Sequence, residues 1–253
     1  MAMIRATPAY NWASATRHGA CVTEDRRFSQ PLYTVAQTSR YVGMPVSTLA
    51  TWAKGYTKHF PARPDVRQGP VVTSLPATPG QPCIPFVGLV EATVVQAFRE
   101  TGLPLQRVRK AISVLADQGE LDHALASSRL YTDGAQVLYD YAREEDDRVL
   151  RLLTVVASGQ RVFHEVITGY LKRISFDDTW PTGLVLPITE RDVLKVDPAV
   201  ASGDPIFMHG GAPLSAVVSR RSAGESAKEI ARDYEVPLED VEDALSAVLP
   251  AAA

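Results

Sequence analysis

The sequence predicts a mainly α-helical protein with small β elements, an α+β fold made of several parts. Apolar residues recur at helical spacing in residues 32–52 and again in residues 214–248. Residues 56–85, by contrast, contain seven prolines and cannot form a helix. A chain of 253 residues also suits two or three small units better than one large domain.

We expect four parts along the chain. They are an N-terminal arm (1–30), a winged helix-turn-helix (31–116), a mixed α/β segment for dimerisation or partner docking (117–195) and a three-helix module (196–253). Little periodicity is visible in the arm, which carries Arg5, Arg17, Arg26 and Arg27. These arginines could touch phosphates or a minor groove, although a frayed tail is the simpler reading.

Residues 32–52 follow the pattern of a helix, a glycine turn and a second helix. Val35, Ala36 and Ser39 recur at helical spacing, so we expect them to form the packed face of the first helix. Gly43 supplies the positive φ that the sharp turn needs. This pattern predicts a helix-turn-helix.

The second helix has the residue pattern of a DNA-recognition helix. Ser47 is expected to cap it, and Leu49 and Trp52 share a face that packs on the first helix. A helix with small, polar and basic residues near its N-terminus can lie in a major groove. The outer face that remains consists of Ser47, Thr48, Thr51 and Lys54.

The charge distribution supports a polyanion-binding N-terminal part. Residues 1–110 hold 13 Lys and Arg against 5 Asp and Glu, a balance of +8, whereas residues 111–253 have a balance of −11. Basic charge gives non-specific DNA affinity, and base contacts must add the specificity. The predicted DNA-binding residues are Arg40, Ser47, Thr48, Thr51, Lys54, Lys58, Arg63 and Arg67.

A wing and a second helical pair follow. Residues 71–75 and 83–86 are β-prone runs around a turn at Pro79-Gly80, which predicts a two-stranded wing with Arg63 and Arg67 near its start. Residues 86–115 are again helical, and residues 101–104 break them into two helices.

The remainder of the chain mixes strands and helices. We expect strands at 136–141, 151–156 and 184–187, and an amphipathic helix from Val162 to Ile174. Three short helices follow a β-like lead-in. Ser226 caps the middle helix, and Glu239 and Asp240 place acid at the start of the last.

The N-terminal pattern resembles the MerR-type winged helix-turn-helix family. The resemblance covers about residues 31–116 and rests on Tyr33–Ala36, Gly43, Ser47–Leu49, Trp52 and the corner Gly102–Leu105. Two features of that family are missing, namely the long dimerising coiled coil and the cysteine clusters of its metal sensors.

The C-terminal segment resembles a small helix-turn-helix domain found in VapB-type antitoxins. The match spans about residues 196–249 and is carried by Gly203–Pro205, Gly210–Gly211, Ser222–Ser226 and Ile230–Tyr234. Ala212 stands where that family often has an arginine. Because residues 197–253 have a balance of −6, we expect this module to contact protein rather than phosphate.

Together the two resemblances imply the antitoxin of a toxin–antitoxin pair. The implied partners are operator DNA, bound by a homodimer, and a PIN-type ribonuclease toxin. In such pairs a basic side chain commonly enters the toxin's acidic site, and Arg220 and Arg221 are the candidates here. Their alternative role is to be solvated, or to pair with Glu225 and Asp233. A stand-alone regulator that responds to a small ligand is the rival reading of the whole chain.

Several other functions are not supported by the sequence. No apolar run approaches the roughly 20 residues of a membrane span, and Cys21 and Cys83 fit reduced thiols of a cytoplasmic protein. We expect no cofactor, no metal and no catalysis, because His164 and Glu165 have no nucleophile at a defined spacing. The acidic run 144–147 suits a solvated loop, and His209–Gly211 suits a tight turn.

Overall fold

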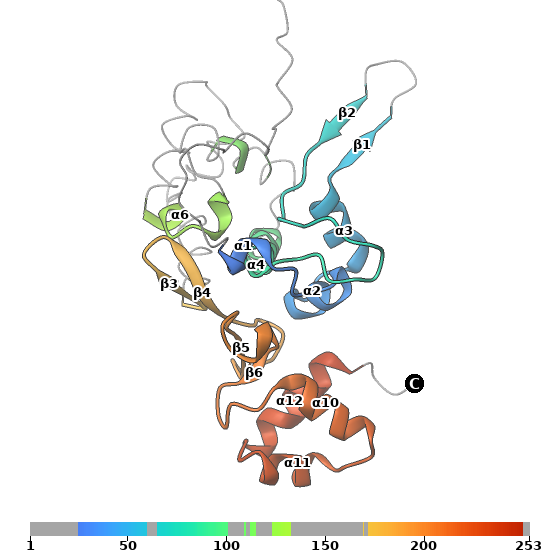
Figure 1. Cartoon of the computed structure of the whole chain (residues 1–253), viewed down its shortest axis with the longest axis vertical. Coiled ribbons are helices and arrows are strands. Elements are labelled where there is room, and N and C mark those ends of the chain that lie inside the picture. The colour runs from blue at the N-terminus through green and yellow to red at the C-terminus, as the bar shows by residue number, and fades with distance from the viewer. Residues whose placement is uncertain are drawn as a thin grey trace, which may run out of the picture.

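The computed structural model describes residues 25–59, 65–100, 109, 112–114, 123–132, 169 and 172–249. Within them the fold is mainly helical with two small antiparallel sheets, which confirms the predicted α+β class. Figure 1 shows helices α1 to α4 in the middle, a β-hairpin projecting from them, and a helical module at the opposite end of the molecule. The predicted division into four parts stays a prediction.

The N-terminal part contains α1 (Arg26–Ser29), α2 (Val35–Val42), α3 (Val46–Lys54) and α4 (Phe86–Glu100). Helix α2, the turn at Gly43 and α3 form the helix-turn-helix. Gly43 ends α2 at φ 70°, as expected, and Leu49 and Trp52 of α3 are fully buried. Their burial fixes α3 against α2 and leaves the opposite side of α3 exposed.

Two local expectations for these helices are wrong. Ser47 does not cap α3, because the helix begins at Val46 directly after Pro45 and Ser47 already lies inside the first turn. On the packed face expected for α2, Ser39 is buried and Val35 is half-buried against the core as predicted, but Ala36 is exposed. The buried face also includes Thr38, Tyr41 and Val42. Since α2 begins at Val35, the 3.6-residue period turns Ala36 away from the core.

Thr34 is the residue that sets the start of α2. Its hydroxyl accepts a hydrogen bond from the Gln37 backbone N–H at 3.1 Å, and the Gln37 side chain accepts one from the Thr34 backbone N–H at 2.9 Å. This reciprocal capping box satisfies two of the free N–H groups at the helix start. The spacing Thr-x-x-Gln is visible in the sequence and could have identified it.

The wing differs from the prediction in position. Its strands are β1 (Tyr56–Lys58) and β2 (Val66–Gln68), an antiparallel pair. Residues 71–75 form no strand, and Ile84 bridges to Tyr33 instead. Four prolines between 76 and 85 have no N–H to donate to a ladder, so this segment packs as a loop. The predicted turn at Pro79-Gly80 is present.

Helix α4 is the centre of the N-terminal core. Val90, Val94 and Ala97 are buried as predicted, and so are most other residues of the helix. Glu91 is buried too, with 3% of its surface exposed. Its carboxylate accepts a hydrogen bond from the Thr73 N–H at 2.6 Å and lies 3.0 Å from Nδ1 of His123. Glu91 thus joins α4 to the loop after the wing and to His123.

The second sheet has the order β3-β4-β5-β6, all antiparallel. Its strands are β3 (Ile174–Asp177), β4 (Trp180–Val185), β5 (Leu194–Val196) and β6 (Ile206–Phe207). The strand expected at 184–187 coincides with the end of β4 only at residues 184 and 185, and two further strands follow. Ile174, expected at the end of a helix, begins β3 instead, because its side chain is buried opposite Leu184.

Three helices complete the chain, as predicted. They are α10 (Leu214–Ser222), α11 (Ala227–Asp233) and α12 (Leu238–Val248). Ser226 caps α11 and forms a capping box with Glu229, and Glu239 and Asp240 lie in the first turn of α12. The turn at residues 208–211 contains Gly210 and Gly211 at positive φ, so the expected tight turn is confirmed.

A buried hydrogen bond joins the start of the helix-turn-helix to the segment that leads into the C-terminal helices. The Tyr33 hydroxyl donates a hydrogen bond of 2.8 Å to the Gly203 carbonyl, which belongs to the short turn η2 (Ala201–Gly203). A Cβ on Gly203 would lie 2.9 Å from the Tyr33 hydroxyl oxygen and from Cδ1 of Leu32. A side chain at residue 203 would have to displace the ends of the Tyr33 and Leu32 side chains, and φ +80° favours glycine there.

Several predicted features lie outside the described residues. Among them are Arg5, Arg17, Cys21, Arg63, the corner 102–105, the strands 136–141 and 151–156, the acidic run 144–147, and residues 162–168 of the expected helix with His164 and Glu165.

We predict that Glu91→Ala lowers the free energy of unfolding by about 2–4 kcal/mol, because it removes a buried carboxylate from the half-buried Thr73 N–H and from His123. Urea denaturation followed by circular dichroism measures the loss. Glu100→Ala, at the exposed end of the same helix, should change stability by no more than about 0.5 kcal/mol. Equal effects of the two variants would contradict the role of Glu91.

Candidate nucleic-acid and partner interfaces

The outer face of α3 brings together four of the predicted DNA-binding residues. Ser47 and Lys54 are exposed, and Thr48 and Thr51 are half-buried. The Thr51 hydroxyl donates a hydrogen bond of 2.8 Å to the Ser47 carbonyl of its own helix. This face therefore offers a short polar surface with one cation at its C-terminal end. It can enter a groove, with Ser47 and Thr48 nearest the helix start.

The hairpin extends this surface away from the body of the molecule (Figure 1). Arg67 lies in β2 directly opposite Thr57, and its side chain is exposed. Lys58 is the last residue of β1, paired in register with Val66. Beyond the strands, Nδ1 of His59 lies 2.7 Å from the Asp65 carboxylate. Arg40 is exposed on the last turn of α2, and Arg63 lies outside the described residues.

The base of the hairpin is attached to α3 through the backbone. The N–H groups of Val71 and Val72 both donate to the carbonyl of Trp52, at 2.8 and 3.2 Å. Gly55 turns the chain from α3 into β1 at φ +71°, where a Cβ would lie 2.3 Å from the Gln68 carbonyl oxygen. The base of the wing is therefore anchored at the C-terminal end of α3.

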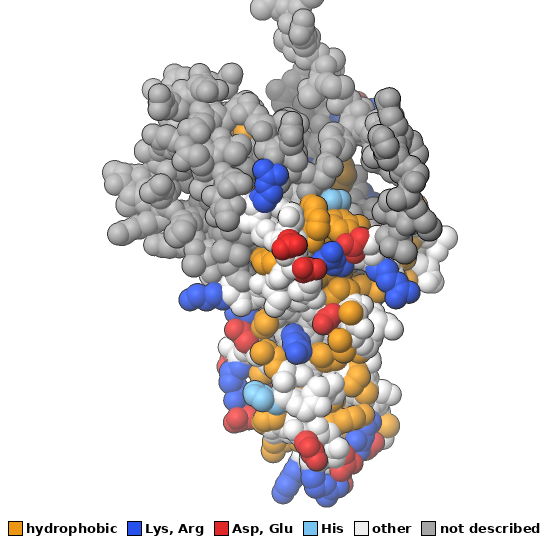
Figure 2. Space-filling model, turned by 60° about the vertical axis from the view of Figure 1, so that its left-hand side comes forward, with side chains coloured by type: hydrophobic (Ala, Val, Ile, Leu, Met, Phe, Trp, Pro, Cys, Tyr) orange, Lys and Arg blue, Asp and Glu red, His pale blue; other side chains and the backbone are white. Residues whose placement is uncertain are grey.

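The C-terminal helices present a different surface. Figure 2 shows Lys, Arg, Asp and Glu side chains gathered together at the end of the molecule that these helices form. Exposed carboxylates outnumber exposed cations on α11 and α12, in keeping with the −6 balance of residues 197–253. The acidic residues with exposed side chains on or between these two helices are Glu229, Asp233, Glu235, Glu239 and Glu242.

Arg220 is held inside this module. Its Nε donates to the Glu225 carboxylate at 2.8 Å and its Nη2 to Asp233 at 2.8 Å, and its guanidinium lies 5.3 Å from the centre of the Tyr234 ring. The hydrogen bonds to Glu225 and Asp233 raise the pKa of Arg220, and the one from Arg220 lowers the pKa of Asp233. Arg220 thus ties α10 to α11 and to the loop between them.

Arg221 lies beside it but is exposed. Its Nη1 donates a hydrogen bond of 3.0 Å to the Glu225 backbone carbonyl. The Glu225 carboxylate itself accepts a hydrogen bond from the neighbouring Arg220. Of the two arginines expected at a protein partner, Arg221 is the one whose side chain is more available for it.

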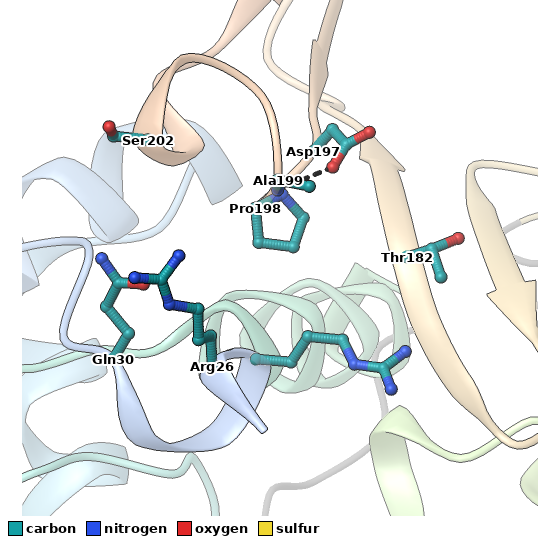
Figure 3. A pocket seen from close by; sticks show the side chains of 8 residues that line it. Arg26, Gln30, Thr182, Asp197, Pro198, Ala199 and Ser202 are labelled. Carbon is teal, nitrogen blue, oxygen red and sulfur yellow. Dashed lines mark hydrogen bonds between the residues drawn. The ribbon is translucent and has the colours of Figure 1, made fainter. Parts of the chain in front are cut away.

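A pocket of about 480 Å³ lies between the N-terminal helices and the second sheet. Figure 3 shows Arg26 of α1 and Gln30, which follows this helix, on one side of the pocket. Thr182 of β4 and the loop at Pro198 line its other sides. Arg27 also lines the pocket, but its guanidinium is held by Asp25 at 2.7 Å. Asp197 turns one carboxylate oxygen to the Ala199 N–H at 2.8 Å.

The described residues contain no group of three or more His, Cys, Asp and Glu side chains placed to hold a metal ion. None of the helices in these parts of the chain is both long and apolar enough to cross a membrane. Cys83 is a free, half-buried thiol whose pKa is raised by burial.

Comparison with known proteins identifies both ends of the chain. A family described as "Putative DNA-binding HTH domain" matches residues 31–112, and a family described as "Protein of unknown function (DUF433)" matches residues 194–246. The fold and these matches define the class, a helix-turn-helix DNA-binding protein with a separate C-terminal module. The two matched ranges correspond to the two resemblances identified in the sequence.

The full-length relatives define the family. The chain is 41% identical over 229 residues to "Putative antitoxin VapB45" of Mycobacterium tuberculosis (strain ATCC 25618 / H37Rv), covering 88% of this chain and 95% of that protein. The crystal structure of Rv2018 from Mycobacterium tuberculosis superposes with a TM-score of 0.70 at 37% identity, covering 87% of this chain and 99% of that one. The chain belongs to the VapB-type antitoxin family, as the sequence indicated.

We predict that Arg220→Ala lowers the melting temperature of the protein at neutral pH, because it breaks two ion pairs and the contact with Tyr234 together. Asp233 has a lowered pKa in the folded protein, so its stabilising effect is present above the unfolded carboxyl pKa of about 3.9 and is lost as the pH falls below it. The difference between the wild type and the variant should therefore shrink below about pH 4.

Calorimetric scans between pH 3 and 8 measure this difference. Arg232→Ala is the matched control, since Arg232 is 76% exposed and pairs with Asp233 alone among the described residues. A pH-independent difference for Arg220→Ala would show that packing, not charge, accounts for its effect.

Proposed function

We propose that the protein is the antitoxin of a type II toxin–antitoxin pair. It binds and neutralises a PIN-type ribonuclease toxin and represses its own operon by binding DNA. The observation that carries this proposal is the presence in one chain of a helix-turn-helix domain at residues 31–112 and the C-terminal module at 194–246. The alignment of this chain with a VapB relative covers 95% of that relative. An antitoxin acts by binding, so the proposal requires no catalytic residue or cofactor, and a repressor of its own operon works in the cytoplasm.

Charge supports a division of labour between the two ends. The part up to residue 110 has a balance of +8 and contains the exposed cations Lys54 and Arg67 beside the polar face of α3. Such a surface gains affinity for DNA by releasing counterions from phosphates. The acidic C-terminal helices would repel phosphate, which favours a protein partner for them.

The DNA site follows from the geometry of helix-turn-helix proteins. A homodimer would present two α3 helices to a palindromic operator, with half-sites about one helical turn, roughly 34–36 Å, apart. The residues proposed to contact DNA are Arg40, Ser47, Thr48, Thr51, Lys54, Lys58, Arg63 and Arg67.

We predict that Lys54→Ala lowers the slope of log K against log salt by about 1 on operator DNA, because one phosphate contact is lost. Fluorescence anisotropy with the region upstream of the gene, at several salt concentrations, measures this slope. Lys228→Ala removes the same charge from the acidic module and should leave the slope as it is. A slope that falls equally in both variants would mean that overall charge, not an α3 contact, determines affinity.

Toxin binding is proposed for the C-terminal module, with Arg221 as its exposed cation. Co-expression of the tagged protein with the adjacent gene should yield a stoichiometric complex and relieve toxicity. We predict that Arg221→Glu weakens this complex at least roughly tenfold if the arginine meets an acidic surface. Lys195→Glu, the same charge reversal at an exposed side chain of strand β5, is the control. Recovery of the protein alone beside a harmless neighbour would refute the antitoxin proposal.

The pocket between α1, β4 and residues 197–202 favours one alternative. A stand-alone MerR-like regulator would use such a pocket to sense a small ligand. In that case a ligand would change operator affinity in the purified protein with no second protein present. The co-expression experiment distinguishes the two functions, because only the antitoxin needs its neighbour.

A further inference from the structure

Arg109 follows α4 and belongs to neither α2, α3 nor the strands of the wing, yet it contacts both legs of the hairpin. Its guanidinium carbon lies 5.6 Å from the centre of the Tyr56 ring, and its Nη1 donates a hydrogen bond to the Gly69 carbonyl. Tyr56 is the first residue of β1, and Gly69 directly follows the last residue of β2. One side chain therefore spans the base of the hairpin from leg to leg.

Arg109 holds this position under conditions unfavourable to a cation. Its Nε and Nη2 are buried and have no hydrogen-bond partner within the described part of the chain. Burial also lowers its pKa. A buried donor without an acceptor lowers stability, so the residue is poorly explained as a contribution to folding alone. The contacts with Tyr56 and Gly69 of the hairpin are the interactions that this buried position allows Arg109 to make.

The register of the hairpin decides which face Arg109 covers. Tyr56 pairs with Gln68, and Thr57 pairs with Arg67. Because successive side chains of a strand point to opposite faces, Tyr56 and Gln68 lie on one face and Thr57 and Arg67 on the other. Arg109 stacks on the first face. The face that carries the exposed cation Arg67 is left open to a partner.

A small movement at the base becomes a larger one along the hairpin. Three strand residues extend each leg roughly 10 Å beyond Gly55. The β1 leg continues directly from α3 through Gly55, and backbone bonds from Val71 and Val72 to Trp52 hold the β2 side of the base. Arg109 adds a contact to Tyr56 on the β1 leg and one to Gly69 after the β2 leg, and so opposes tilting of the hairpin about this base.

We propose that Arg109 is a positioning residue that fixes the hairpin on α3 and directs the Thr57–Arg67 face toward the DNA backbone. The inference rests on the proposed DNA-binding function, and it makes Arg109 act through Arg67 rather than by touching DNA itself. Arg109 is suited to this because a planar guanidinium can stack on an aromatic ring while it donates to a carbonyl.

The first test needs no DNA. Hydrogen–deuterium exchange of the full-length protein should speed up at residues 56–58 and 66–68 in Arg109→Ala, by roughly tenfold, with residues 46–54 of α3 unchanged. Tyr56→Leu removes the ring from the other side of the contact and should have the same effect. Since Tyr56 is 37% exposed, this variant keeps the core intact should Arg109→Ala fail to fold.

Arg99→Ala is the matched control for exchange. Arg99 also lies over an aromatic ring in the same part of the molecule, 5.6 Å from the centre of the Trp52 ring, but it makes no hydrogen bond or ring contact with the described residues of the hairpin. Exchange at residues 56–58 and 66–68 should remain at the wild-type rate in this variant. Unchanged exchange in both Arg109→Ala and Tyr56→Leu would overturn the positioning role, whatever the result of the DNA-binding experiments.

The second test is a double-mutant cycle on operator DNA. Arg67→Ala should weaken binding roughly tenfold and lower the salt slope by about 1. Arg109→Ala should do nearly the same, and the double variant should be little worse than either single one, because both remove one contact. Additive losses would instead make Arg109 a direct DNA contact. Absence of wild-type DNA binding would refute the proposed function and leave the exchange result to decide the positioning role.

Discussion

The hydrogen bond from Tyr33 to Gly203 joins the start of the helix-turn-helix to the lead-in of the C-terminal module, and it helps to set the relative placement of the two proposed interfaces. Tyr33 is buried beside Tyr41, its backbone bridges to Ile84, and its hydroxyl donates to the Gly203 carbonyl at 2.8 Å. Burial raises the pKa of this hydroxyl, so it keeps the proton that it donates. Because Gly203 has no Cβ, residues 32 and 33 can approach the backbone of η2 directly. The start of the helix-turn-helix and the lead-in to the C-terminal module are thus parts of one packed structure.

Arginine has several different uses in this structure, and the sequence does not distinguish them. Of the 26 basic residues 20 are arginine, a residue whose planar guanidinium can donate several hydrogen bonds and stack on a ring. Arg27 is neutralised by Asp25, Arg220 is shared between Glu225 and Asp233, and Arg109 lies against Tyr56. Arg67 and Arg221 are exposed. A count of basic residues therefore overstates the charge that either surface can offer to a partner.

The two proposed interfaces are rigid for different physical reasons. The α3 face is held by apolar packing of Leu49 and Trp52 and by backbone hydrogen bonds to the loop after the wing. The C-terminal surface is held by ion pairs over a smaller core, with Arg220 at their centre. We infer that salt and acid disturb the C-terminal surface first, whereas substitutions of buried apolar residues disturb the DNA-binding face first. This difference gives an experimental route to perturb one proposed activity without the other.

The sequence by itself determined the features that depend on short-range physics. The helix-turn-helix at 32–52 with its turn at Gly43, the burial of Leu49 and Trp52, the cap at Ser226 and the apolar stripe of α12 all follow from spacing and from the backbone preferences of single residues. Family resemblance, carried by these same residues, identified the class. Only the tertiary structure decided the features that depend on long-range partners. Ile84, expected to pair with residues 71–75 in the wing, pairs with Tyr33 instead. Helix α3 begins directly after Pro45, so Ser47 lies inside the helix and not at its cap. Arg220 is withdrawn from the surface by two carboxylates and Arg109 reaches the hairpin across 40 residues, because contacts between distant segments are set by packing and not by local pattern.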